Sequence, residues 1–186
     1  MTASQQQQNA RLYAAPSGRE VFIPETEIVI SEVDLAGKIT YGNDAYWRIT
    51  GFSRQRTLGI ANHQTWHPGM PRAIFRLLGE RLDAEKNAFA YILGITEEGD
   101  HFWEFGQIMP TYGTDGNRRG LLIVRRAANP ATLRIIVPLY EKLRAIEIAA
   151  AEKNAGARRS KMALDAILNE LGQSYEELIF SRAVTA

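Results

Sequence analysis

The chain has 186 residues, 45% of them hydrophobic, and a formal net charge of +1. This size suits one domain with a buried core and a smaller appendage, and the near-zero charge gives no indication of a nucleic-acid partner. The lack of cysteine excludes disulfides, thiolate metal sites and cysteine catalysis, and fits a reducing cytoplasm. Without a secretory leader or a run of about 18 apolar residues, the sequence predicts a cytoplasmic protein with no membrane span.

The N-terminal third begins with a polar stretch and continues into two short strands and a helix. Residues 1–19 are rich in Gln, and we interpret them as a mobile tail. The segments TEIVISEVD and GKITYG are rich in β-branched residues and are joined by LAG, which predicts a β-hairpin. Asn43 or Asp44 can cap the short helix that follows, and Gly51 can end it.

The middle of the chain predicts one longer helix and three strands. Pro71 suits the first residue of a helix whose apolar stripe consists of Ile74, Phe75, Leu77, Leu78 and Leu82. Alternating hydrophobic residues then predict strands in NAFAYILGIT, HFWEFGQIMPTY and LLIVRR, which are separated by the turns EEGD and TDGNRRG.

The C-terminal third predicts amphipathic helices. Asn129 and Pro130 mark a helix start, and the residues that recur on one side of this helix are Leu133, Ile136, Tyr140 and Leu143. Residues 152–161, EKNAGARRSK, are interpreted as a polar hinge, after which MALDAILNEL resumes the helical pattern. The segment SYEE, from Ser174 to Glu177, is a capping box that predicts a last short helix.

Together these elements predict an α+β domain, an antiparallel sheet with short helices gathered on one face. We place the domain at residues 20–128, after a tail at 1–19 and before a helical extension at 129–186. A lone helix cannot bury the apolar stripes of the extension, so we expect these helices to pack on the sheet or on a second subunit. We favour a homodimer.

Four segments, in this order, resemble the PAS domain, and most closely the PAS module of bacterial aerotaxis receptors and its stand-alone relatives. They are DLAGKITYGNDAYWRITGFS, HPGMPRAIF, EEGDHFWEFGQIMP and VPLYEKLRA, and the resemblance covers residues 20 to 145. It implies a PAS fold with a five-stranded antiparallel sheet. It also implies a bacterial sensory or signal-relay module, often dimeric, which in aerotaxis receptors holds FAD non-covalently for redox or oxygen sensing.

The flavin segment of the family departs from its usual form in this chain. It typically reads Arg-His-Pro-Asp-Met-Pro, whereas here it reads WHPGMP, with Trp66 in place of the arginine and Gly69 in place of the aspartate. Gly94 falls where the family has an asparagine. Neither replacement in WHPGMP can form a charge-assisted hydrogen bond with a flavin, although Trp66 can stack on an isoalloxazine ring. We therefore expect purified protein to be partly or wholly without FAD.

Three family positions match as they stand, namely Asn43, His67 and Trp103. Together with Trp66 and Tyr91 they are the candidate cofactor-binding residues. For Asn43, a helix-capping role is the alternative to a hydrogen bond with a ligand. For Tyr91 and Trp103, plain core packing is the alternative to pocket lining, because aromatic residues at every second position of a strand usually fill a core.

His67 has further interpretations. His63 and His67 are four residues apart, which suits a metal on a helix, but Pro68 and Gly69 end any helix there and no third ligand lies nearby. Either imidazole can serve as the axial ligand of a haem. A purely structural role, with His67 bonding the main chain of an irregular loop, is the remaining interpretation. FAD thus ranks first among named cofactors and haem second, and a protein without any cofactor remains an alternative.

No catalytic motif is present, neither a Ser-His-Asp order, H-E-x-x-H, a P-loop nor G-x-G-x-x-G, and we expect no enzyme. The basic pairs Arg125–Arg126 and Arg158–Arg159 lack interleaved aromatic residues and are interpreted as solvated faces. The sequence predicts a stand-alone PAS protein that senses a small ligand, or redox or oxygen state, and relays it by protein–protein interaction to a histidine kinase, chemoreceptor or other regulator. The alternative is a cofactor-free adaptor that docks to a kinase, chemotaxis or polarity protein.

Overall fold

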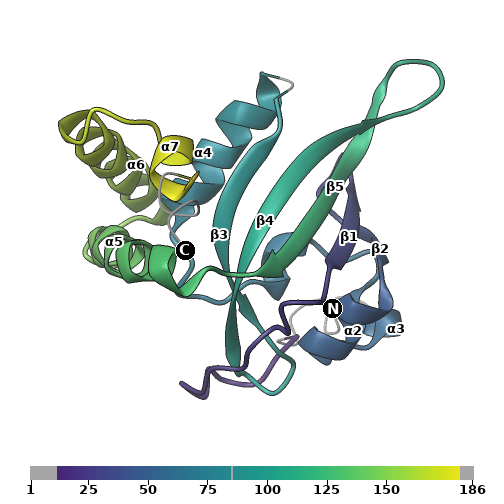
Figure 1. Ribbon diagram of the computed structural model, residues 1–186. Coiled ribbons are helices and arrows are strands. Elements are labelled where there is room, and N and C mark those ends of the chain that lie inside the picture. The colour runs from purple at the N-terminus through teal and green to yellow at the C-terminus, as the bar shows by residue number, and fades with distance from the viewer. Residues whose placement is uncertain (1–11, 85, 181–186) are drawn as a thin grey trace.

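The computed structural model describes residues 12–84 and 86–180, which form one sheet and a series of helices (Figure 1). The first half contains β1 (Val29–Asp34), β2 (Ile39–Gly42), α2 (Asp44–Thr50), α3 (Arg54–Thr57), the 3-10 helix η1 (Asn62–Thr65) and α4 (Arg72–Asp83). The second half contains β3 (Ala88–Ile95), β4 (His101–Tyr112), β5 (Arg118–Ala127), α5 (Pro130–Ile148), α6 (Lys153–Glu170) and α7 (Tyr175–Phe180).

The sheet has the strand order β2-β1-β5-β4-β3, and every pairing is antiparallel. The first and last strands, β1 and β5, lie side by side in its interior. The strands β4 and β5 form a long twisted hairpin that extends past the rest of the sheet (Figure 1). The predicted α+β class, with a five-stranded antiparallel sheet, is confirmed.

The strand register assigns each side chain to one of two faces, because successive residues of a strand point in opposite directions. The inner face carries Ser31, Ile92, Glu104 and Arg125. The outer face carries Tyr91, Trp103, Phe105 and Arg126. Helix α2 packs on β1 and β2, and α4 packs on β3.

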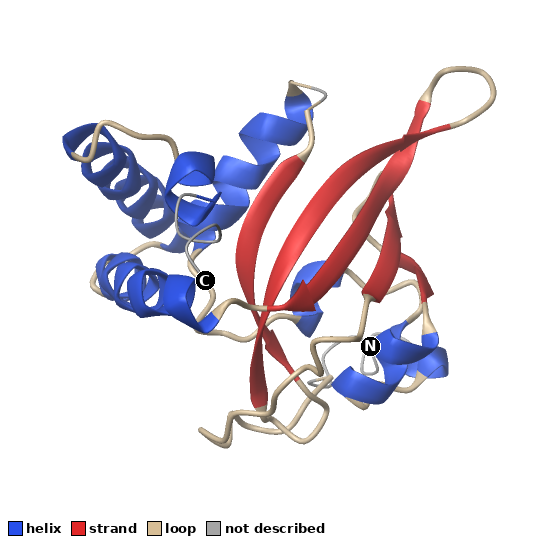
Figure 2. Cartoon of the chain, viewed as in Figure 1, coloured by secondary structure: helices blue, strands red, loops and turns tan. Residues whose placement is uncertain are grey.

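The C-terminal helices gather beside β3, at the end of the sheet away from β2 (Figure 2). Helix α5 packs on α6, both contact α4, and α7 packs on β3. The apolar side of α5 is buried through Ile136, Tyr140 and Leu143. Within residues 12–84 and 86–180, no helix has both the length and the apolar character needed to cross a bilayer.

The predicted hinge at residues 152–161 is wrong, because α6 already begins at Lys153. Contacts with α5 explain why this polar segment is helical. A Cβ on Gly156 would lie 2.9 Å from the carbonyl oxygen of Glu147, so the glycine allows the two helices to approach closely. Ser160 donates a hydrogen bond of 2.7 Å to the Glu147 carboxylate. Tertiary packing here overrides a weak local preference.

Other local helix signals are confirmed. The Asn43 side chain accepts a hydrogen bond from the first turn of α2, and Gly51 ends that helix with a φ of 70°. At α7, Ser174 Oγ accepts a hydrogen bond from the Glu177 N–H, and the Glu177 carboxylate accepts one from the Ser174 N–H. These contacts are the reciprocal pair of a capping box.

Residues 12–19 differ from the mobile tail expected there, whereas residues 1–11 lie outside the described part of the chain. Main-chain hydrogen bonds join the segment to the turn between β3 and β4, and Arg19 forms an ion pair with Asp100 of that turn. A Cβ on Gly99 would lie 2.2 Å from a carbonyl oxygen of the segment, so only glycine permits this approach. The polar turn supplies the partners that anchor the segment.

Candidate functional site

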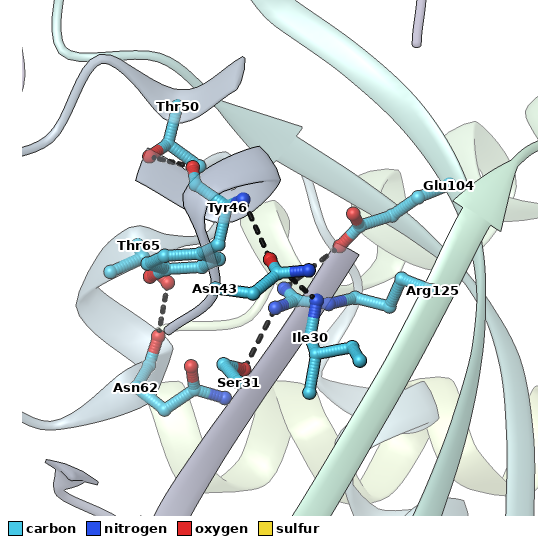
Figure 3. A network of polar contacts seen from close by, with 9 residues as sticks. All are labelled: Ile30, Ser31, Asn43, Tyr46, Thr50, Asn62, Thr65, Glu104 and Arg125. Carbon is cyan, nitrogen blue, oxygen red and sulfur yellow. Dashed lines mark hydrogen bonds and ion pairs between the residues drawn. The ribbon is translucent and has the colours of Figure 1, made fainter. Parts of the chain in front are cut away.

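A buried ion pair lies on the inner face of the sheet, where Arg125 Nη1 donates to Glu104 Oε1 at 3.2 Å (Figure 3). The two side chains are only 4% and 2% exposed. Arg125 Nη2 donates to Ser31 Oγ at 2.7 Å, and the guanidinium lies 5.1 Å from the centre of the Tyr46 ring. Strands β1, β4 and β5 and helix α2 thus all contribute to one polar cluster, which we call the Glu104–Arg125 cluster.

The expectation that Arg125 belongs to a solvated basic pair is wrong. The alternation of β5 turns Arg125 inward and leaves Arg126 exposed on the outer face. Sequence reasoning also missed Glu104 as a site residue. The sequence contains a signal for it. In HFWEFG, Glu104 lies on the same strand face as the inward-facing Phe102 and Gly106, and a single charge on a buried face needs a partner.

The Glu104–Arg125 cluster is incompletely hydrogen-bonded. Glu104 Oε2 and Arg125 Nε are buried without a partner among residues 12–84 and 86–180, and so are Asn62 Oδ1 and Trp66 Nε1. Buried polar atoms are normally paired, so these four atoms leave hydrogen-bonding capacity of this region unused. Burial raises the pKa of Glu104, and the neighbouring Arg125 opposes this shift. The charge of Glu104 therefore depends on its contact with Arg125.

Asn43 uses its amide to hold the main chain together. Its Oδ1 accepts the N–H groups of Tyr46 and Ile30, at 2.9 and 3.1 Å (Figure 3). Its Nδ2 donates to the carbonyl oxygen of Ile28 at 2.8 Å. It thereby joins the start of α2 to β1. These contacts fit the helix-capping interpretation.

Trp66 lies on the inner side of β3, where it is bridged to Gly94 in an antiparallel register. Its ring stacks on Phe75 of α4, with ring centres 4.0 Å apart and an angle of 15°. Gly94 itself has no space for a larger side chain, because a Cβ there would lie 2.3 Å from the ring of Phe102. The Phe102 ring thus occupies the space that a side chain at position 94 would need.

His67, the next residue after Trp66, turns to the outer side. Its side-chain Nδ1 accepts the N–H of Gly69 at 3.0 Å, and its main-chain N–H donates to the carbonyl oxygen of Leu93. Burial, and then the nearby His101, lower the pKa of His67 to about 4. A neutral imidazole has one free lone pair, and Gly69 already uses it, so His67 is poorly suited to bind haem iron or a metal. No group of three potential metal ligands occurs in the described residues.

Tyr91 and Trp103 lie on the outer face, under the C-terminal helices. The Trp103 ring is 5.7 Å from that of Tyr140 in α5, and the Tyr91 ring is 5.3 Å from that of Phe105. The five candidate residues therefore do not converge on one site. Trp66 lies on the inner side, Asn43 bonds the main chain of α2 and β1, and only His67 and Trp103 share a pocket, on the outer face.

A flavin does not fit the inner face as it is packed. Tyr46, Ile74 and Ile92 are completely buried there, and Phe102 is 3% exposed. A planar ring system of three fused rings would have to displace several of these side chains. The Glu104–Arg125 cluster offers hydrogen bonds to a polar edge, but the surrounding side chains leave the rings no space.

No protein-family model matches the chain. The chain is 26% identical over 117 residues to the aerotaxis receptor of Escherichia coli (strain K12), a match that spans 63% of this chain and 23% of the receptor. A light-oxygen-voltage domain studied with a flavin analogue is 19% identical, with a TM-score of 0.50 over 62% of this chain and 86% of that one. The light state of the aureochrome1 LOV domain, a blue-light photoreceptor, is 17% identical, with a TM-score of 0.50 over 74% and 97%. The five-stranded sheet and these structural likenesses show that the chain has the PAS/LOV fold.

Proposed function

We propose that this PAS protein is a sensory relay that transmits a change at the Glu104–Arg125 cluster to its C-terminal helices, and that it holds no resident flavin. The observation that carries the proposal is that β4 contacts the Glu104–Arg125 cluster on one face and the C-terminal helices on the other. Glu104 points to the inner cluster, whereas its neighbours Trp103 and Phe105 point to the outer face. Trp103 lies against Tyr140 of α5, and Phe105 lies 5.7 Å from the Phe180 ring of α7.

A shift of β4 would therefore change the side-chain contacts on both faces of the sheet. Strand β5 reinforces this coupling, because Arg125 bonds Glu104 while Arg126 lies over the Phe105 ring at 5.4 Å. A small polar ligand that bonds the free atoms of the cluster would stabilise one arrangement of β4 over another. The docking of α5 and α7 would change with it, as a shift between two populations.

The output of the relay is a protein–protein contact with a separate signalling protein, such as a histidine kinase, a chemoreceptor or another regulator. The likeness to an aerotaxis receptor supports a sensory role, with small-ligand, redox or oxygen state as the signal. We further propose that the active form is a cytoplasmic homodimer. Exposed apolar residues on the C-terminal helices support this, notably Ile148 and Met162, which are 69% and 70% exposed.

A cofactor-free adaptor is the second candidate function, and the filled inner face favours it. An adaptor would use the same outer surface for docking but would bind nothing at the Glu104–Arg125 cluster. An absorption spectrum of freshly purified protein separates both candidates from a flavin or haem sensor. We expect no visible absorption bands, and stoichiometric flavin bands or a Soret band would contradict the proposal.

Hydrogen–deuterium exchange tests the relay itself. Glu104→Gln keeps the shape of the side chain but removes its charge, and we expect altered exchange in β4 and also in α5 and α7. Glu32→Gln is the matched control, because Glu32 is an exposed residue of β1 that lies outside the cluster. A change confined to the inner face, with α5 and α7 exchanging as in the wild type, would disprove the relay and leave the adaptor.

A further inference from the structure

A pocket of about 580 Å³ opens on the outer face of the sheet, on the side opposite the Glu104–Arg125 cluster. Strands β3 and β4 contribute Leu93 and Trp103 to its lining, the loop after Trp66 contributes His67, and α5 contributes Tyr140 and Ala145. Its volume falls in the range of roughly 300–1,000 Å³ that is typical of small-molecule sites. The pocket touches the sheet, a loop and the helical extension at once.

Aromatic side chains give the pocket flat walls. The indole of Trp103 lies 5.7 Å from the ring of Tyr140, and the imidazoles of His67 and His101 lie 5.9 Å apart. Aliphatic groups complete the lining, including Leu93 and Val137. Walls of this kind favour a planar ring, because offset stacking and apolar burial both stabilise it.

His67 offers this pocket a hydrogen-bond donor of fixed position. The Gly69 N–H occupies Nδ1, so the neutral ring carries its proton on Nε2. The Tyr140 hydroxyl has no proton left to donate to a ligand, since it donates to the carbonyl oxygen of Tyr91. It also contacts the hydroxyl of Tyr175. A ligand must therefore present an acceptor, such as a carbonyl oxygen, to His67.

The lining of the pocket includes one acidic side chain, Glu141, and one basic side chain, Arg144. Glu141 is exposed, and Arg144 is paired with Glu147 at 3.2 Å. Among the described residues that line the pocket, no unpaired Lys or Arg side chain is thus offered to an acidic ligand, and the donor of His67 is uncharged. We propose that this pocket binds a neutral planar aromatic carbonyl compound of the quinone type. This site is separate from the Glu104–Arg125 cluster and does not depend on the relay proposed above.

Isothermal titration calorimetry of the full chain with menadione, a soluble naphthoquinone, tests the site. The chain has no cysteine, so addition of the quinone to a thiol does not interfere. We expect saturable one-to-one binding in the micromolar range. Ala145→Phe should weaken binding at least tenfold, because the exposed Ala145 on α5 allows a phenyl ring to fill the pocket without loss of a polar contact. Ala131→Phe, an exposed position of the same helix outside the pocket, should bind as the wild type does.

His67→Phe tests the hydrogen bond, since it keeps a flat ring but removes the donor, and we expect an affinity loss of about 3- to 10-fold. Glu32→Gln should leave menadione binding unchanged, because Glu32 is an exposed residue of β1 that does not line the pocket. The proposal is overturned by a lack of saturable binding up to the solubility limit of menadione. Equal affinity of Ala145→Phe and Ala131→Phe, or loss of binding in Glu32→Gln, overturns it as well.

Discussion

The hydroxyl groups of Tyr140 and Tyr175 lie 2.7 Å apart, between α5, α7 and the edge strand β3. Tyr140 donates to the carbonyl oxygen of Tyr91 at 2.7 Å, and the Tyr91 N–H donates to the Tyr175 hydroxyl at 3.4 Å. Since the Tyr140 proton is used in this way, Tyr175 donates to Tyr140, and the three bonds form a closed ring. The tyrosines thus pair main-chain groups that an edge strand would otherwise leave open. Burial raises the pKa of both tyrosines, so both keep their protons near neutral pH.

Tyr140→Phe should lower the free energy of unfolding by about 1–3 kcal/mol, because it removes two hydrogen bonds and leaves a buried carbonyl oxygen unpaired. Urea denaturation followed by circular dichroism measures the change. Tyr112→Phe is the control, since Tyr112 is 48% exposed at the end of β4. The double variant Tyr140→Phe/Tyr175→Phe should lose less than the sum of the single losses. Strictly additive losses would contradict the closed ring.

Glu147→Ala should destabilise the protein by about 2–3 kcal/mol, because the buried carboxylate joins three helices. It accepts the Ala73 N–H at the start of α4, at 3.1 Å, and the Ser160 hydroxyl of α6. Glu170→Ala, at the exposed end of α6, is the matched control. Thermal unfolding measures the loss. A Glu147→Ala variant as stable as Glu170→Ala would show that the hydrogen bonds of Glu147 contribute nothing to stability.

Removing one partner of the Glu104–Arg125 pair should destabilise the fold by about 3–5 kcal/mol, because an unpaired charge then remains buried. Arg125→Met is the variant of choice, and chemical denaturation measures its stability. The double variant Glu104→Leu/Arg125→Met should regain most of that loss, since two apolar side chains can pack where two charges did. If the double variant were less stable than Arg125→Met alone, the pair itself would not be the cause.

Acidification should destabilise the protein through His67. The pKa of His67 is lowered to about 4 in the folded chain, whereas the pKa of an unfolded histidine is near the ordinary value of 6.5. Between these values the unfolded state binds more protons, so stability falls as the pH decreases through this window and is unaffected by His67 above it. Histidine ring signals in NMR spectra report the titration. A folded-state midpoint near 6 would contradict the buried, Gly69-bonded imidazole.

Local hydrogen bonds and turns could be predicted because their partners lie within four residues. The Asn43 cap, the Gly51 helix end and the Ser174–Glu177 capping box all depend on neighbours in the chain, and all three are present. The strand segments were equally visible, since alternating hydrophobic residues reflect a period of two. The helical start of α6 was missed because Glu147, which lies in another helix, supplies its contacts.

The sequence by itself determined the strands, the caps and the order of elements that resembles a PAS domain, because each depends on spacing along the chain. It also placed Trp66 beside His67, and Glu104 between Trp103 and Phe105. Only the tertiary structure decided which side of each strand meets which helix. Alternation sends adjacent residues to opposite faces, but the covering of each face comes from helices far away in sequence. For that reason His67 and Trp103 meet in an outer pocket, while Glu104 and Arg125 are buried together on the inner face.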